Sequence, residues 1–239
     1  GRIMSRPEYL TAVNGETGAA VHTVWYNPNR AMGQNAAGTY SSNWGDDYGN
    51  RGERFLACVA YLDGPDKNPS AVMCRGYYTA SYLWAVDFDG RKLSTHWRHA
   101  STSKSIAQVT DRNGKATTKV YTKNTAGVAG SYAGYGQGNH SIGVADVDGD
   151  GCDEIIYGSA TIDNDGFLLY TTGLGHGDAL HVADMMPDRE GLEVMTPHED
   201  SPYGFDVHDA ATGEIIHHVT GNGDTGRGMA ADYTLSSRG

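Results

Sequence analysis

The feature that most constrains the fold is an acidic turn that runs directly into an apolar strand. Asp146, Asp148 and Asp150 alternate with other residues, and Glu154 precedes the apolar run 155–157. Carboxylates this close together repel one another unless a cation lies between them, and oxygen ligands at this density suit Ca²⁺ better than Zn²⁺ or Cu²⁺. The alternative is an Asx-rich turn that holds no metal.

The spacing of this turn excludes the helical calcium hand. With Asp146 at position 1, an EF-hand requires a bidentate Glu at position 12, where this chain has Tyr157. A compact loop ahead of a strand is instead typical of the metal-bound blades of β-propellers. Four carboxylates and one backbone carbonyl form the predicted Ca²⁺ ligand set: Asp146, Asp148, Asp150, Glu154 and Cys152.

Two strand–turn phrases recur along the chain. One joins two apolar strands through a Gly-containing turn, at 10–24, 83–97, 160–171 and 206–219. The other ends in Asp146, Asp184 and Asp232, at intervals of 38 and 48 residues, the length of a four-stranded blade. The repeats predict an all-β fold, a β-propeller fragment with about three full blades and partial ones at either end. The full blades are predicted near 51–100, 139–175 and 176–222.

Composition agrees with a sheet protein and limits its partners. The chain has 33 Gly and 15 Tyr, which favours strands and tight turns, and a formal net charge of −11, which argues against nucleic acid. No apolar run approaches the length of a membrane span, and the first residues do not resemble a signal peptide. We therefore expect no membrane association and a secreted, extracellular protein whose export signal is removed or lies outside this sequence. Residues 101–138, rich in Ser, Thr, Lys, Gly and Asn, predict a surface insertion in the single propeller domain 1–239.

The three cysteines leave the disulfide state open. If a hairpin turns around Asp66, Cys58 and Cys74 lie opposite each other on adjacent strands. Directly opposed positions rarely accept a disulfide without strain. The alternative is that these two residues and Cys152 are small buried side chains.

Five short polar motifs lie between the predicted strands, where loops from successive blades converge at one end. Four of the five place charged or imidazole groups beside Gly, which lets the backbone approach a ligand closely. A His in such a motif ligates a metal, contacts a sugar hydroxyl, or is a hydrogen-bonded turn residue. Histidines outside the motifs are predicted to be surface or packing residues. The motifs occupy residues 44–51, 136–141, 175–181, 197–200 and 226–229.

Together with the acidic turn, these motifs resemble the rhamnogalacturonan lyases of polysaccharide lyase family 11. The resemblance runs from about Glu8 to Asp232, and six motifs in the right order make it specific. It implies an eight-bladed propeller that binds several Ca²⁺ ions and cleaves the rhamnogalacturonan I backbone of pectin. Members of the family are roughly twice this length or more, so the chain is expected to cover the central part of the propeller.

The resemblance also implies β-elimination between rhamnose and O4 of galacturonate. Calcium neutralises the uronate carboxylate and so acidifies the C5 proton, a base removes that proton, and the O4 leaving group departs. Arg227 and His176 are the implied catalytic residues, and Arg227 suits carboxylate anchoring because a guanidinium pKa is normally above about 12. The implied substrate contacts are Asp46, Asn50, Asn139 and Arg227. The implied further metal ligands are His140, His176, Asp178, Glu193, His198 and Glu199.

The sequence therefore predicts a calcium-dependent lyase that acts on an acidic polysaccharide and is a monomer at full length. No long insertion separates Gly213 from Arg227, which leaves the cleft open and favours endo cleavage. We expect the fragment by itself to lack part of the active site. The alternative is a non-catalytic calcium-binding propeller module that binds polysaccharide or protein.

Overall fold

The computed structural model describes residues 5–32, 38–39, 44–45 and 51–231, and their regular structure is antiparallel β-sheet with one short 3₁₀ helix, η2 (Arg51–Glu53). The strands form sheets of six, four, four, two and two strands. The all-β class predicted from the repeats is thereby confirmed. Among the described residues, no helix has the length and apolar character needed to cross a bilayer.

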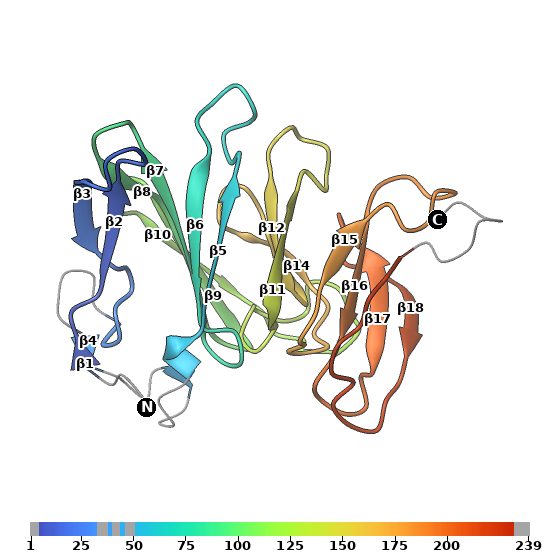
Figure 1. Cartoon of the computed structure of the whole chain (residues 1–239). Helices are drawn as coiled ribbons and strands as arrows, with labels where there is room; N and C mark the ends of the chain where they lie inside the picture. The colour runs from blue at the N-terminus through green and yellow to red at the C-terminus, as the bar shows by residue number, and fades with distance from the viewer. Residues whose placement is uncertain (1–4, 33–37, 40–43, 46–50, 232–239) are drawn as a thin grey trace.

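Three of the sheets are meanders that stand side by side in chain order (Figure 1). The first contains β5 (Phe55–Ala60), β6 (Ser70–Arg75), β7 (Ser81–Phe88), β8 (Leu93–Ser103), β9 (Ile106–Asp111) and β10 (Ala116–Val120). The second contains β11 (Gly138–Ala145), β12 (Glu154–Gly158), β13 (Ala160–Ile162) and β14 (Leu168–Thr171). The third contains β15 (His181–Ala183), β16 (Glu193–Pro197), β17 (Phe205–Asp209) and β18 (Ile215–Val219).

The two small sheets lie before the meanders in the chain. They pair β1 (Ser5–Arg6) with β4 (Gly38–Thr39), and β2 (Tyr9–Val13) with β3 (Ala20–Trp25). A buried ion cluster holds the N-terminal region against the first meander, since Arg75 is 1% exposed and bonds Glu8 at 2.9 Å. Removing one partner of such a buried pair typically costs about 3–5 kcal/mol.

The middle meander is the centre of the packing. Ile155 and Ile156 are consecutive on β12, so they point to opposite faces of the sheet, and both are fully buried. Ile155 belongs to the same buried core as Leu83 and Trp97 of the first meander, and Ile156 belongs to a second core with Val194 of the third. The uninterrupted apolar run after the acidic turn is thus explained by burial of both faces.

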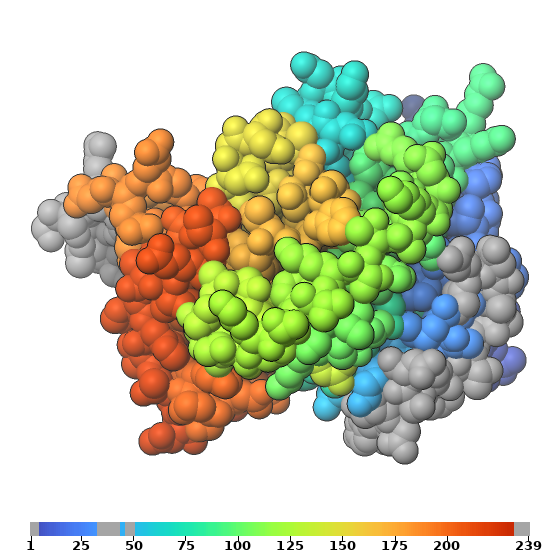
Figure 2. All heavy atoms as spheres, turned by 180° about the vertical axis from the view of Figure 1, so that it is seen from behind, coloured from blue at the N-terminus to red at the C-terminus, as the bar shows by residue number. Residues whose placement is uncertain are grey.

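Residues 101–138 add to the first meander and then cover the second. β9 and β10 extend the first sheet, and the chain that follows crosses behind the middle meander (yellow-green in Figure 2). There the N–H groups of Gly127 and Gly130 donate to the carbonyls of Thr172 and Thr171. This contact covers the outer edge of β14, which would otherwise expose unpaired backbone groups.

The register of β5 and β6 corrects the expected alignment of the cysteines. Cys58 lies opposite Val72, and Cys74 lies opposite Leu56. The hairpin is centred one residue before Asp66, which moves the pairing by two positions. All three cysteines are free thiols.

His99 ties the first meander to the second. Its side chain, 1% exposed, reaches the carbonyl oxygen of Gly166 with Nδ1 (2.8 Å) and the hydroxyl of Ser101 with Nε2 (2.9 Å). Burial lowers the pKa of His99 to about 4.

We predict that His99 makes the protein less stable in mild acid. An unfolded His takes up a proton near pH 6.5 but the buried one only near pH 4, so the free energy of unfolding falls as the pH drops through this window. The shift from 6.5 to about 4 corresponds to a loss of about 3 kcal/mol in the free energy of unfolding once the pH has fallen below both values. Urea denaturation of the intact protein at pH 7 and pH 5 should show a smaller loss in His99→Gln than in the wild type. Equal losses would contradict the assignment.

Candidate active site and metal centres

Two groups of metal-ligand side chains lie at opposite ends of β11. His140, His176 and Asp178 gather at its start, and Asp146, Asp148 and Glu154 gather beyond its end. Within each group, the ligand atoms lie within 4.8 Å of one another. The strand separates the groups by about 20 Å, so they are two distinct centres.

His176 presents an unprotonated nitrogen to its neighbours. Its Nδ1 lies 2.5 Å from the carbonyl oxygen of Gly138, which only accepts, so Nδ1 carries the proton. Burial lowers the pKa of His176 to about 4, which keeps the imidazole neutral at pH 7. The buried Nε2 has no hydrogen-bond partner among the described residues and lies 3.5 Å from Oε2 of Glu199 and 3.8 Å from Oδ1 of Asp178.

His140 completes this centre, and two tyrosines orient it. The hydroxyls of Tyr77 and Tyr78 lie 2.9 Å from Nδ1 and 2.8 Å from Nε2 of His140. The same Nε2 lies 3.2 Å from Oδ1 of Asp178. Burial lowers the pKa of His140, while the Asp178 charge opposes that shift and nearby Arg54 and Arg227 add to it.

The tyrosines were not among the residues singled out from the sequence. They follow β6 in the run Arg75–Gly–Tyr–Tyr78, at the end of the sheet where the polar motifs also lie. The signal that could have identified them is this placement, because an aromatic pair after a Gly turn lies in a loop beside its strand end.

Hydrogen-bond acceptors outnumber donors in the His140 centre. His176 Nε2 and the carboxylates of Asp178 and Glu199 are acceptors, and neutral imidazoles do not balance the carboxylate charge. A divalent cation at this point would satisfy the buried nitrogen and the carboxylates together. The donor set therefore fits a metal, with His140, His176 and Asp178 as ligands and Glu199 within reach.

The acidic turn forms the second centre. Asp146 accepts hydrogen bonds from the N–H groups of Gly149 (2.8 Å) and Gly151 (3.1 Å), and Glu154 Oε2 accepts from Val147 (2.8 Å). Glu154 Oε1 is buried and has no hydrogen-bond partner among the described residues. Burial, together with the Asp charges around it, raises the pKa of Glu154 to about 8. A bound cation would let this carboxylate ionise, so the turn fits Ca²⁺.

Two other residues predicted for this set lie outside the Asp146–Asp148–Glu154 group. The carboxylate of Asp150 accepts a hydrogen bond from the N–H of Cys152 at 2.7 Å. The role of the Cys152 carbonyl stays a prediction.

Glu193 repeats the local geometry of Glu154, but a side-chain cation lies beside it. Its Oε2 accepts from the N–H groups of Met185 (2.9 Å) and Met186 (3.0 Å), as Glu154 does in the acidic turn. Its Oε1, however, lies 3.6 Å from Nε of Arg189. Arg189 supplies positive charge here, whereas no described residue supplies it at the acidic turn. Glu193 thus lies in an ion pair, outside both candidate metal groups.

His198 and Asn139 support the site from behind. His198 is fully buried and its Nε2 bonds Asp206 Oδ1 at 2.6 Å. Asn139, also fully buried, donates to the carbonyl of Ala179 and to the hydroxyl of Thr196, both at 2.7 Å. Neither side chain is exposed to a ligand. These contacts hold the loops that carry Glu199 and Asp178, and the metal-ligand role of His198 and the substrate contact of Asn139 stay predictions.

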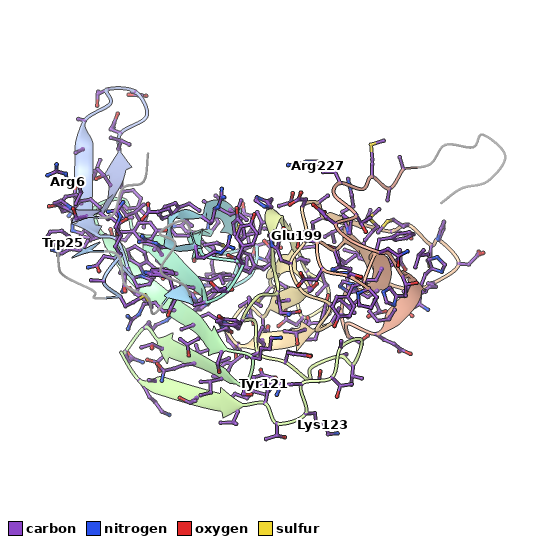
Figure 3. The ribbon with its side chains drawn as sticks, turned by 90° about the horizontal axis from the view of Figure 1, so that it is seen from below. Arg6, Trp25, Tyr121, Lys123, Glu199 and Arg227 are labelled. Carbon is purple, nitrogen blue, oxygen red and sulfur yellow. The ribbon has the colours of Figure 1, made fainter. Side chains whose placement is uncertain are left out.

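Arg227 lies at the rim of the His140 centre. Its exposed guanidinium donates to the carbonyl of Asp178 at 3.4 Å, and Figure 3 shows it on the same side of the molecule as Glu199. The remaining predicted substrate contacts, Asp46 and Asn50, lie outside the described residues.

A comparison with protein families decides what this arrangement belongs to. The model of the C-terminal domain of rhamnogalacturonan lyase family 11 matches residues 1–239. The chain belongs to this family. The family 11 resemblance is confirmed, and the matching region is the C-terminal domain, in place of the central part expected from the motifs.

Curated relatives of this family 11 chain include enzymes of two cleavage types. It is 49% identical over 241 residues to rhamnogalacturonan exolyase YesX of Bacillus subtilis (strain 168), covering 100% of the chain and 34% of the relative. It is 47% identical over 234 residues to rhamnogalacturonan endolyase YesW of the same organism, covering 97% of the chain and 32% of the relative. The chain thus spans about a third of the length of these relatives.

Solved structures agree with this assignment. Exotype rhamnogalacturonan lyase YesX matches the family 11 chain with a TM-score of 0.81 at 49% identity, covering all of the chain and 34% of YesX. The Bacillus licheniformis rhamnogalacturonan lyase PL11 matches with a TM-score of 0.79 at 48% identity, covering all of the chain and 35% of that enzyme.

Gly177 allows the two loops of the His140 centre to meet in this family 11 chain. A Cβ atom at Gly177 would overlap the carbonyl oxygen of Pro197, so the loop that carries His176 and Asp178 would be pushed away from the loop that carries Glu199. The N–H of Glu199 also donates to the carbonyl of His176 at 2.9 Å.

We predict that Gly177→Ala lowers the free energy of unfolding by about 1–3 kcal/mol, the usual cost of overpacking. Gly15→Ala is the matched control, because nothing lies within 4 Å of a Cβ there. Chemical denaturation of both variants measures the difference. A Gly177→Ala protein as stable as the control would contradict this packing.

Proposed function

We propose that this chain carries one side of the active site of a calcium-dependent rhamnogalacturonan lyase, and that the complete protein cleaves rhamnogalacturonan I by β-elimination. The observation that carries the proposal is the meeting of His176 Nε2 with the carboxylates of Asp178 and Glu199 beside the exposed Arg227. The named activities of YesX and YesW support the substrate class.

The chain's own residues divide the work of such a site. His140, His176 and Asp178 would hold the cation, with Glu199 in reach, and bound Ca²⁺ would supply the positive charge that neutralises the uronate carboxylate. Arg227 would anchor the same carboxylate through its guanidinium. Since the lone pair of His176 faces the carboxylates of Asp178 and Glu199, we assign His176 to ligation.

We further propose that the three meanders are blades of an eight-bladed propeller in the complete protein. Their side-by-side order and the length of the relatives, about three times that of this chain, support this architecture.

We also propose a secreted monomer that meets its polymeric substrate outside the cell. The short connection between Gly213 and Arg227 supports endo cleavage, which a rapid fall in the viscosity of rhamnogalacturonan I would test.

Lyase activity tests the proposal directly. We expect the full-length protein to generate the ultraviolet absorbance of an unsaturated uronate from rhamnogalacturonan I, and a chelator to abolish it. His176→Ala should lower the rate by about 100-fold because it removes a metal ligand. His217→Ala, which removes an exposed imidazole from β18, should leave the rate unchanged.

The same assay separates the lyase from the non-catalytic module. If the full-length protein binds rhamnogalacturonan I saturably but generates no new absorbance at any Ca²⁺ concentration, the lyase proposal is wrong. That result would support the non-catalytic binding module. Replacement of Ca²⁺ by Mn²⁺ or Zn²⁺ after chelation would identify the metal that the two imidazoles prefer.

We predict that Ca²⁺ bound at the acidic turn stabilises the protein. At a Ca²⁺ concentration 100 times the dissociation constant, one site adds about 2.7 kcal/mol to the free energy of unfolding. Asp146→Asn should reduce the Ca²⁺-dependent rise in melting temperature. Asp184→Asn is the control, because Asp184 is the equivalent residue of the turn in which Arg189 supplies the cation. A full Ca²⁺ effect in Asp146→Asn would contradict the site.

A further inference from the structure

We propose that a pocket beside the His140 centre binds a second uronate of the substrate chain. The pocket has a volume of about 580 Å³ and shares Tyr78, His176 and Glu199 with that centre. This size is within the range of small-ligand pockets, which is about 300–1,000 Å³. The inference rests on the proposed function, because it assumes that the polysaccharide crosses the His140 centre.

The charge of the pocket is opposite to that of the chain. The formal net charge is −11, but Arg51, Arg54 and Lys104 all line this pocket. Arg51 lies in η2 and Arg54 lies between η2 and β5, whereas Lys104 comes from the turn between β8 and β9. Cations collected from separate segments of an acidic chain form a local positive field, which attracts anionic ligands.

Two of these cations, Arg54 and Lys104, have no carboxylate partner among the described residues. The buried Nε of Arg54 also has no hydrogen-bond partner there. A carboxylate is the group that satisfies a guanidinium and an ammonium together. Glu199 and Asp200 also line the pocket, so the carboxylate of a bound sugar would be drawn towards Arg54 and Lys104 and away from that loop.

Aromatic rings provide surfaces for the sugar itself. Tyr78 and Tyr132 line the pocket, with Lys104 Nζ 5.8 Å from the centre of the Tyr132 ring. Tyr78 has Arg51 4.3 Å from its ring centre, and its hydroxyl lies 2.8 Å from His140. Tyr78 thus belongs to both sites, so a chain bound in the pocket continues into the His140 centre.

Rhamnogalacturonan I alternates uronate with neutral rhamnose, so a second anionic site selects longer chains. A sugar held at the His140 centre brings the next uronate along the chain within reach of a neighbouring site. We infer that the pocket raises affinity for oligosaccharides that contain at least two uronates and leaves the chemical step unchanged.

Kinetics of the full-length protein test the inference. With oligosaccharides that contain several uronates, Lys104→Gln should raise KM about tenfold at unchanged kcat, and Lys104→Arg should restore most of the affinity. With oligosaccharides in which the uronates flanking the cleaved unit have been carboxyl-reduced, the wild type and Lys104→Gln should have the same KM. Lys123→Gln is the control, since Lys123 is exposed, lies outside the pocket, and projects from the outer side of the molecule (Figure 3).

Three outcomes would overturn the subsite. They are an unchanged KM in Lys104→Gln, an equal rise in KM with carboxyl-reduced substrate, and an equal rise in Lys123→Gln. Failure of the lyase proposal has a different signature, because the wild type would then give no unsaturated product from any substrate. In that case calorimetric titration with the same oligosaccharides still tests the pocket, through the loss of affinity in Lys104→Gln.

Discussion

Clustering of carboxylates at the two ends of β11 is the constraint on which the rest of this structure depends. The strand begins at the His140 centre and ends at the acidic turn. At each end, carboxylates converge with a buried acceptor for which the described part of the chain offers no donor. Buried acceptors and like charges are costly unless something positive lies among them. A cation at each end would convert two repulsive clusters into rigid loops.

The third meander shows another solution to the same problem. Glu193 and Glu154 each accept backbone N–H groups from the preceding turn. Arg189 reaches Glu193, whereas no side-chain cation among the described residues reaches Glu154. Related turns thus neutralise a buried glutamate either with a fixed guanidinium or, as we propose, with a metal ion. Only the second allows stability to respond to the concentration of an ion.

Packing of the middle meander connects these loops to one another. Because Ile155 and Ile156 fill cores on opposite faces of β12, the first and third meanders are both held against the strand that pairs with β11. The acidic turn is also tied to the first meander, since the carboxylate of Asp153 accepts from the N–H of Tyr61 at 2.7 Å. At the opposite end, Tyr77 and Tyr78 bring the first meander to His140.

The sequence by itself determined the all-β class, the strand–turn repeats, the family, and the grouping of Asp146, Asp148 and Glu154, because alternation and short spacing fix which neighbours share a turn. It also named His140, His176 and Asp178, through motifs that strand ends bring together. Only the tertiary structure decided that His198 pairs with Asp206, that Asn139 is buried, that Arg189 occupies the cation position beside Glu193, and that Cys58 and Cys74 are offset. These outcomes depend on register and on contacts between distant segments. Local spacing does not encode such contacts, and one residue of shift in a hairpin changes every pair.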